Sequence, residues 1–325
     1  MRDDDEADMR DTRRTDLLAV GDASVDYFVS VPHIARADDK AIGRLLAVSG
    51  GGMSANCSAA AAYIGACARL ITAYGSDEAG GEQLRALSAA GVDTSECVRT
   101  ADAQSWFCFV QLDPSGEKAL VGVETDAKIP DLDAVSDDAL RSARIVMPLA
   151  DDLPWAIALA ERARAAGAAV AVDLEPSAVD MQRADLSVLL RLANYVFANR
   201  ASVELLSNGD FDACATEIQR HGAEVVVLTD GGRGARAYDA SNAWSARSRV
   251  DAVVDTTGAG DALAGAFIGA WSGGADLSSA LRTGVGVASL CVEHIGARTY
   301  ALAVPSDTPA FDRRLQGVEL TQEER

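Results

Sequence analysis

A glycine-rich turn near the C-terminal end of the chain carries the residues best suited to phosphate chemistry. The sequence at 255–262 reads Asp-Thr-Thr-Gly-Ala-Gly-Asp-Ala and leads into an alanine-rich helical stretch. Gly258 and Gly260 can adopt backbone angles closed to other residues, so successive amide groups can converge on one anion at a helix N-terminus. Asp261 would face that anion, which suits a base that takes a proton from an attacking hydroxyl group. The alternative is that Asp261 only caps the helix.

Three other glycine-rich turns follow strand-like runs. The apolar run at 45–48 leads into Ser-Gly-Gly-Gly-Met-Ser-Ala-Asn at 49–56, which opens a helical stretch. A second turn at 75–80 and a third at 229–232, reading Thr-Asp-Gly-Gly, each end a strand-like run of their own. Ligands of parallel α/β sheets bind beyond the carboxyl ends of the strands, which is where these turns lie.

Strand-like and helical segments alternate along most of the chain. Runs typical of strands at 69–74, 145–148 and 195–198 are interleaved with helical runs such as 80–90 and 154–166. Alternation of this kind predicts an α/β fold with a mostly parallel sheet that is covered by helices on both faces.

In order and rough spacing, the four turns resemble the motifs of the ribokinase/PfkB carbohydrate kinase family. The family's N-terminal Gly-Gly signature appears at Gly51 and Gly52, and its C-terminal signature, Asp-Thr-x-Gly-Ala-Gly-Asp, appears at 255–261. The resemblance covers roughly residues 16–315. It implies a three-layer α/β/α sandwich with a mostly parallel central sheet and a small β-sheet lid.

The resemblance implies ATP-dependent phosphorylation of a hydroxyl group of a sugar or a sugar-like acceptor. Asp261 would be the general base. The segment Gly258–Asp261, through main-chain amides such as those of Ala259, Gly260 and Asp261, would hold the transferring phosphoryl group, and Mg²⁺ would bridge nucleotide oxygens. Because a helix N-terminus lowers the pKa of an aspartate, Asp261 is expected to be a weak base, which a loose transition state tolerates.

Residues near the first strand are the candidates for acceptor binding. Asp26 matches the family position at which an aspartate binds sugar hydroxyls, and Asp22, earlier in the same segment that leaves the first strand, could also reach the pocket. Asn56 can both donate and accept hydrogen bonds, which suits a polyol. Gly51 and Gly52 would let a sugar approach the main chain; as plain turn residues they and Asp26 would need no ligand.

Nucleotide binding is assigned by the resemblance to the later turns. The candidates are Asn199, Thr229, Asp230, Gly231, Gly232, Gly258, Gly260 and His294. The segment around Gly296 is expected to form a possible monovalent-cation (K⁺) site together with Asp255.

Two positions depart from the family pattern. Family members carry a glutamate in an Asn-x-x-Glu motif that organises Mg²⁺ through water, but the corresponding residue after Asn199 is Ser202. Mg²⁺ is still expected, because nucleotide phosphates themselves bind it. Ribokinase itself has a lysine where this chain has Met53, so ribose is not favoured as the acceptor.

The resemblance divides the chain into three parts. Residues 1–16 form a charged acidic tail that is expected to be disordered, 17–315 form the kinase domain, and 316–325 are expected to fray. Lid strands are predicted within about 26–48 and 105–125, the second segment containing a turn signal.

Composition excludes several classes of protein. The chain has 325 residues, 49% of them hydrophobic, and a formal net charge of −20, which does not favour binding to nucleic acid or to an anionic membrane. Its three lysines never follow glycine, so a Walker A motif is absent. No apolar run is long enough to span a bilayer, and the six scattered cysteines are expected to be buried thiols. A cytoplasmic location is therefore predicted.

Three other functions remain open on sequence grounds. A nucleoside kinase would share the scaffold and differ in its acceptor pocket. A dinucleotide-binding oxidoreductase is weakly indicated by the glycines at 50–52, although no acidic residue closes the next strand. A non-catalytic sugar-binding regulator is indicated only by Ser202. Nor does the sequence decide whether the acceptor already carries a phosphate, which Arg44, Lys118 or Lys128 could bind from the lid.

The lid segments are rich in large apolar residues. They include Trp106, Phe107 and Phe109. An appendage that faces water on both sides would not expose so many large apolar side chains. Family resemblance indicates that two lids pack against each other, so a homodimer is predicted.

Overall fold

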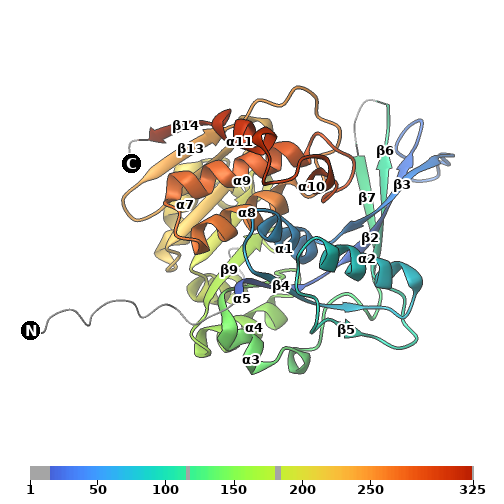
Figure 1. Ribbon diagram of the computed structural model, residues 1–325, viewed down its shortest axis with the longest axis horizontal. Helices are drawn as coiled ribbons and strands as arrows, with labels where there is room; N and C mark the ends of the chain where they lie inside the picture. The colour runs from blue at the N-terminus through green and yellow to red at the C-terminus, as the bar shows by residue number, and fades with distance from the viewer. Residues whose placement is uncertain (1–14, 115–117, 180–183, 324–325) are drawn as a thin grey trace, which may run out of the picture.

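The computed structural model describes residues 15–114, 118–179 and 184–323, which form a large sheet, two layers of helices and a small sheet (Figure 1). Ten strands make up the large sheet. In spatial order they are β14 (Glu319–Glu323), β13 (Ala243–Arg247), β12 (Ala235–Tyr238), β11 (Val225–Thr229), β10 (Tyr195–Asn199), β9 (Ala169–Leu174), β8 (Ala143–Pro148), β1 (Thr15–Gly21), β4 (Ala68–Tyr74) and β5 (Val98–Arg99). Neighbours from β11 to β5 are parallel, and β12, β13 and β14 extend one edge in antiparallel pairing.

The central strands are apolar on both sides because each face of the sheet is covered by helices. Leu17 belongs to one buried core cluster, whereas its neighbours Leu18 and Val20 belong to another on the opposite face. The helices on the Leu17 side are α1 (Met53–Tyr63), α2 (Glu78–Ala89), α8 (Ala259–Ser272) and α9 (Leu277–Cys291). Those on the Leu18 side are α3 (Asp137–Ser142), α4 (Leu153–Ala165), α5 (Ala184–Leu192), α6 (Arg200–Ser207) and α7 (Phe211–Arg220). The predicted three-layer arrangement is confirmed.

Two short helices complete the layer on the Leu17 side. Tyr300 of α10 (Tyr300–Ala303) and Phe311 of α11 (Pro309–Gln316) pack with Tyr63 of α1 in a third core cluster. No helix within the described residues is long and apolar enough to cross a membrane.

The small sheet, called the lid sheet below, contains four strands in the order β3-β2-β6-β7. Their bounds are β3 (Arg44–Gly51), β2 (Ser24–Ser30), β6 (Phe107–Leu112) and β7 (Lys118–Val123). β2 pairs in parallel with β6, and the two outer pairs are antiparallel. Figure 1 shows the lid sheet standing beside the sandwich, next to α2 and α10. Part of the predicted turn at 113–117 lies outside the described residues.

Both predicted tails need correction where the structure describes them. Residues 316–325 were expected to fray, but Glu319–Glu323 forms strand β14, which pairs along its length with β13. Leu320 packs against the core cluster beneath β13, and backbone hydrogen bonds to β13 provide the remaining stabilisation of β14. At the other end, β1 already begins at Thr15 within the predicted tail, while residues 1–14 lie outside the described part of the chain.

Candidate active site

Small residues on α1 and α8 bring together two motifs that are far apart in the sequence. Gly265 of α8 lies so close to α1 that a Cβ atom there would be 2.0 Å from the carbonyl oxygen of Cys57. Where the two helices pack closely, Nδ2 of Asn56 on α1 donates a hydrogen bond to Oδ2 of Asp261 on α8 at 2.8 Å. The helix that follows the Gly50–Gly52 turn and the helix that follows the 255–261 turn therefore meet at their N-terminal ends.

The turn at 255–261, called the glycine turn below, depends on Gly258 for its shape. Gly258 is the N-cap of α8 and has φ of 75°, in the left-handed region that favours glycine. A Cβ atom on Gly258 would lie 2.3 Å from Cβ of Ala297, whereas one on Gly260 would meet nothing within 4 Å. The surrounding protein therefore leaves no room for a side chain at position 258. Position 260, by contrast, leaves the first turn of α8 open to a ligand.

The pKa of Asp261 is raised well above its usual range because the carboxyl is removed from water. The hydrogen bond from Asn56 opposes this shift, while the negative charges of Asp173, Asp22 and Glu175 add to it. The lowered pKa expected from the helix N-terminus is therefore wrong, because burial raises it. Asp261 is a stronger base than an ordinary aspartate.

The two predicted acceptor-binding aspartates lie beside the Gly50–Gly52 turn. Asp22, at the end of β1, accepts a hydrogen bond from the main-chain nitrogen of Ser54 at 3.0 Å, and burial raises its pKa to about 6. Asp26 on β2 accepts a hydrogen bond from Oγ of Ser24 at 2.6 Å, and burial raises its pKa as well. A Cβ atom on Gly51 would lie 2.0 Å from Oδ2 of Asp26, so this carboxylate rests directly against the turn.

The predicted nucleotide-binding residues at the ends of β10 and β11 are neighbours in the sheet. Asn199 and Thr229 pair in register, and Asn199 caps α6 by accepting a hydrogen bond from the nitrogen of Ser202 at 3.0 Å. Asp230 forms ion pairs with Arg200 and Arg233, and these hydrogen bonds lower its pKa. Both glycines that follow, Gly231 and Gly232, have open space where a side chain would stand.

Asp255 joins the glycine turn to the segment after α9. Its Oδ1 accepts hydrogen bonds from the nitrogen and Oγ1 of Thr257, and its Oδ2 accepts one from the nitrogen of Gly296 at 3.0 Å. His294, three residues beyond the end of α9, is engaged differently: its Nδ1 bonds to the carbonyl oxygen of Leu290 in the last turn of that helix at 2.9 Å. The structure thus links Asp255 to the turn but gives His294 only a local contact.

Two acidic residues that the sequence analysis missed lie at the end of β9. Asp173 is buried, and loss of water raises its pKa to about 7, with the charge of Glu175 adding to the shift. Oε1 of Glu175 accepts a hydrogen bond from Nδ2 of Asn199 at 3.3 Å. Ser202, which stands where a glutamate was expected, donates its hydroxyl to the carbonyl oxygen of Leu174 at 2.6 Å. Their position at the carboxyl end of a buried strand was the available signal.

The lid sheet contacts the glycine turn directly. Nζ of Lys118, at the start of β7, donates a hydrogen bond to Oγ1 of Thr257 at 3.2 Å. Lys128 instead pairs with Asp151 at 3.0 Å and lies over the ring of Trp106, and Arg44 is exposed on β3. Of the three basic residues considered for the lid, only Lys118 reaches the turn.

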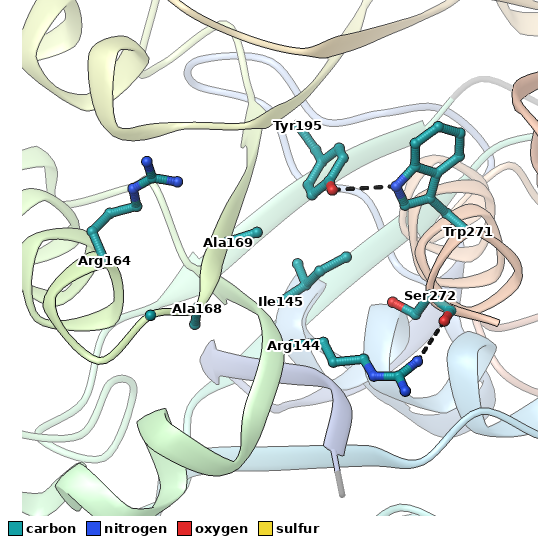
Figure 2. A pocket seen from close by; sticks show the side chains of 9 residues that line it. Arg144, Ile145, Arg164, Ala168, Ala169, Tyr195, Trp271 and Ser272 are labelled. Atoms are coloured by element: carbon teal, nitrogen blue, oxygen red, sulfur yellow. Dashed lines mark hydrogen bonds between the residues drawn. The ribbon is translucent and has the colours of Figure 1, made fainter. Parts of the chain in front are cut away.

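A pocket of about 630 Å³ lies at the amino-terminal ends of three central strands of the large sheet (Figure 2). Its lining comes from the amino-terminal ends of β8, β9 and β10 and from the C-terminal end of α8, where the ring nitrogen of Trp271 bonds to the hydroxyl of Tyr195. The Gly50–Gly52 turn and the turn at 229–232 lie at the carboxyl ends of β3 and β11. The glycine turn follows no strand directly, but Asp261 lies near Asp22 and Asp173 at the carboxyl ends of β1 and β9. This pocket is therefore separate from the candidate active site.

Comparisons with known proteins agree on one family. Residues 14–303 match the model of the pfkB family carbohydrate kinase. The chain is 28% identical to the ATP-dependent ribose-1-phosphate kinase of Halopiger xanaduensis, across 87% of this chain and 94% of that one. It is 26% identical to the nucleoside kinase of Methanothermobacter thermautotrophicus, across 87% and 91%. A ribokinase II candidate from E. coli, solved with ATP and Mg²⁺, matches 93% of this chain and 99% of its own with a TM-score of 0.79 at 20% identity. This likeness confirms the predicted fold.

Proposed function

The chain belongs to the pfkB family of carbohydrate kinases, and from that premise we propose that it transfers the γ-phosphoryl group of ATP to a hydroxyl group of a sugar or sugar-like acceptor. The observation that carries the proposal is the hydrogen bond between Asn56 and Asp261 at the open end of α8. It places a carboxylate of raised pKa beside a helix N-terminus that has room for an anion.

In the proposed reaction, Asp261 accepts the proton of the acceptor hydroxyl. The hydroxyl oxygen forms a bond to the γ-phosphorus while the bond from that phosphorus to the bridging oxygen of ADP breaks. Main-chain amides of Ala259 and Gly260 hold the negative charge of the phosphoryl group, and the shape imposed by Gly258 directs them there. Lys118 from the lid sheet adds positive charge at Thr257.

The proposed nucleotide contacts lie at the ends of β10 and β11. They are Asn199, Thr229, Asp230, Gly231 and Gly232. No group of three His, Cys, Asp or Glu side chains in the described part of the chain is arranged to hold a metal ion by itself. When bound to the nucleotide phosphates, Mg²⁺ supplies neutralising charge.

Glu175 would contact that ion through water, because its carboxylate lies at Asn199 where Ser202 provides none. A monovalent cation such as K⁺ would act through Asp255, which already links the glycine turn to Gly296.

The structure bears on the competing functions. A dinucleotide-binding oxidoreductase needs its glycines between a central parallel strand and a helix, but the Gly50–Gly52 turn follows β3 of the lid sheet. The nucleoside kinase differs from the main proposal only in its acceptor, and one relative bears that name. Acceptor-dependent release of ADP, measured over pentoses, ketohexoses, sugar acids, phosphosugars and nucleosides, separates these cases from a non-catalytic regulator.

Changing Asp26 to Ala is expected to raise the KM of the acceptor about 10-fold or more and to leave the KM of ATP within about twofold. A carboxylate that accepts hydroxyl hydrogen bonds contributes roughly 1.5–3 kcal/mol to binding. Steady-state kinetics with each substrate varied in turn provide the measurement, with Asp307→Ala, an exposed aspartate elsewhere, as the control. An equal loss for both substrates would assign Asp26 a structural role.

A homodimer formed through the lid sheet is part of the proposal. Val48, Tyr27, Phe109 and Val121 lie in register across its four strands and share one face. Val48 is 50% exposed, Phe109 41% and Val121 51%, and Leu45 on β3 is exposed beside them. An apolar face of this kind, continuous over all four strands, fits a second copy of itself.

Replacing Phe109 with Asp is expected to convert the dimer into monomers of about 33.8 kDa and to weaken acceptor binding. A charge at the centre of an apolar contact costs several kilocalories per mole, which is enough to separate the subunits. Light scattering on eluted protein measures the mass, and Leu205→Asp, an exposed leucine on α6, is the control. An unaltered protein that is monomeric at micromolar concentration refutes the dimer without affecting the kinase assignment.

The proposal also includes a cytoplasmic location, where ATP is available. All six cysteines are free thiols, and Cys57, Cys108, Cys214 and Cys291 are buried. Reduced thiols are the rule in that compartment. The acidic net charge supports the absence of nucleic-acid and membrane partners.

A further inference from the structure

Arg298 reaches the candidate acceptor site from the segment after α9. Its Nη2 donates a hydrogen bond to Oε1 of Gln83 on α2 at 3.0 Å. A Cβ atom on Gly50 would lie 1.5 Å from Nη2 and 1.9 Å from Oε1 of Gln83. The guanidinium therefore occupies the space that a side chain at position 50 would fill, directly beside the turn predicted to bind the acceptor.

The guanidinium of Arg298 is charged but incompletely satisfied. Removal from water lowers its pKa to about 10, and the negative charges of Asp26, Asp22 and Asp261 oppose that shift. It therefore remains protonated at neutral pH. Its Nη1 is buried and has no hydrogen-bond partner among the described residues. A buried donor of a charged group that lacks a partner is costly, so its retention calls for a ligand.

Arg298 and Asp26 lie against consecutive residues of β3, Gly50 and Gly51, and they are close enough that the charge of each shifts the pKa of the other. Arg298 lies where the Cβ atom of Gly50 would be, and Asp26 lies where that of Gly51 would be. A guanidinium is suited to carboxylate and phosphate groups, which accept two of its N–H groups at once. A carboxylate such as Asp26 is suited to hydroxyl groups.

We infer that the acceptor of this kinase carries an anionic substituent, a carboxylate or a phosphate, which binds Arg298 while Asp26 binds a hydroxyl group of the same molecule. The inference rests on the proposed function and narrows its substrate class. Gln83 is a positioning residue, since it holds Nη2 and thereby leaves Nη1 directed to the ligand.

A purely structural role for Arg298 would look different. As a counter-ion for Asp26, it would direct an N–H group at the carboxylate, but Nη1 has no such partner and Asp26 accepts a hydrogen bond from Ser24 instead. The pKa of Asp26 also remains raised, although the charge of Arg298 lowers it. Attraction between the two groups is therefore incomplete, which leaves Arg298 available to an anion.

The test compares three acceptors that share a carbon skeleton: a neutral pentose, its phosphate monoester and its aldonic acid. For the unaltered enzyme, kcat/KM is expected to be at least about 10-fold higher for one of the anionic acceptors than for the neutral pentose. Arg298→Gln is expected to raise the KM of that anionic acceptor about 10- to 100-fold and to reduce this preference, with the KM of ATP unchanged. Arg298→Lys should retain part of the preference because it keeps the charge but loses the planar fork.

Two further variants separate an effect of the guanidinium from an effect on the fold. Gly50→Ala displaces the flexible ends of Arg298 and Gln83 without backbone strain and should also reduce the preference. Arg313→Gln removes an exposed positive charge elsewhere and should not. A preference for the phosphate or for the acid identifies the anion, and either supports the inference. Equal kcat/KM for all three acceptors, or an equal loss on neutral and anionic acceptors in Arg298→Gln, overturns it.

The anion site can also be tested if the protein proves not to be a kinase. If none of the acceptors is phosphorylated, titration calorimetry of the pentose phosphate and the aldonic acid against the unaltered protein and Arg298→Gln still measures anion binding. Binding that requires Arg298 supports the anion site although the kinase assignment has failed. Affinities that are equal in both proteins refute the site.

Discussion

Replacing Asp261 with Asn is expected to lower kcat by about 100-fold or more while the KM of ATP changes little. The amide keeps the size of the carboxylate and can still accept the hydrogen bond that Asn56 donates at 2.8 Å. It cannot accept the proton of the attacking hydroxyl group. Pre-steady-state and steady-state rates with saturating ATP and acceptor provide the measurement.

The control for this prediction is Asp251→Asn, which removes a charge from an exposed aspartate in the segment before the glycine turn. Because burial raises the pKa of Asp261, the unaltered enzyme should lose kcat/KM with falling pH at a higher pH than an ordinary aspartate would cause. The base acts when deprotonated, so activity falls as pH drops through this pKa. A variant with near-normal turnover, or one with the same acid limb as the unaltered enzyme, contradicts the role of Asp261.

Replacing Gly258 with Ala is expected to destabilise the protein by about 1–3 kcal/mol and to lower kcat/KM by about 100-fold. The φ of 75° strains any residue with a Cβ atom, and that atom would lie 2.3 Å from Cβ of Ala297. Relief of this clash moves the start of α8 and with it the amides and Asp261. Thermal unfolding and kinetics measure the two effects.

Gly260→Ala is the matched control for stability. It changes the neighbouring glycine of the same turn, where a Cβ atom meets nothing within 4 Å. Its free energy of unfolding should stay within about 0.5 kcal/mol of the unaltered protein or increase slightly, because alanine favours a helix. Equal stability of the two variants would show that the conformation of Gly258 does not hold the turn.

The parts of the fold that the sequence predicts well are those with strong local patterns. Buried parallel strands such as β8 and β11 are short apolar runs, and the helices between them begin at recognisable turns. Strand β14 was missed because Leu320 is its only large apolar residue. Its position is determined by backbone pairing with β13, which depends on tertiary structure and leaves no periodic signal.

In the candidate site, too, residues in local motifs could be predicted from the sequence, whereas residues placed by tertiary contacts could not. Gly258 and Asp261 stand in a motif whose chemistry can be argued from residue types alone. Arg298 could not be predicted, because its role depends on the space beside Gly50, almost 250 residues earlier in the chain. The predicted direction of the pKa shift at Asp261 was wrong for a related reason: local sequence reveals the helix N-terminus but not the burial of the carboxyl, which raises its pKa.

The most direct test of the central claim is to follow the γ-phosphoryl group itself. The protein is incubated with Mg²⁺, the acceptor panel and ATP that carries ¹⁸O in the γ-phosphoryl group, and the products are analysed by mass spectrometry. We expect a phosphomonoester of an acceptor that contains the labelled oxygens, formed in step with ADP and absent with Asp261→Asn. Label that appears only in inorganic phosphate, or no labelled product with any acceptor, would contradict it.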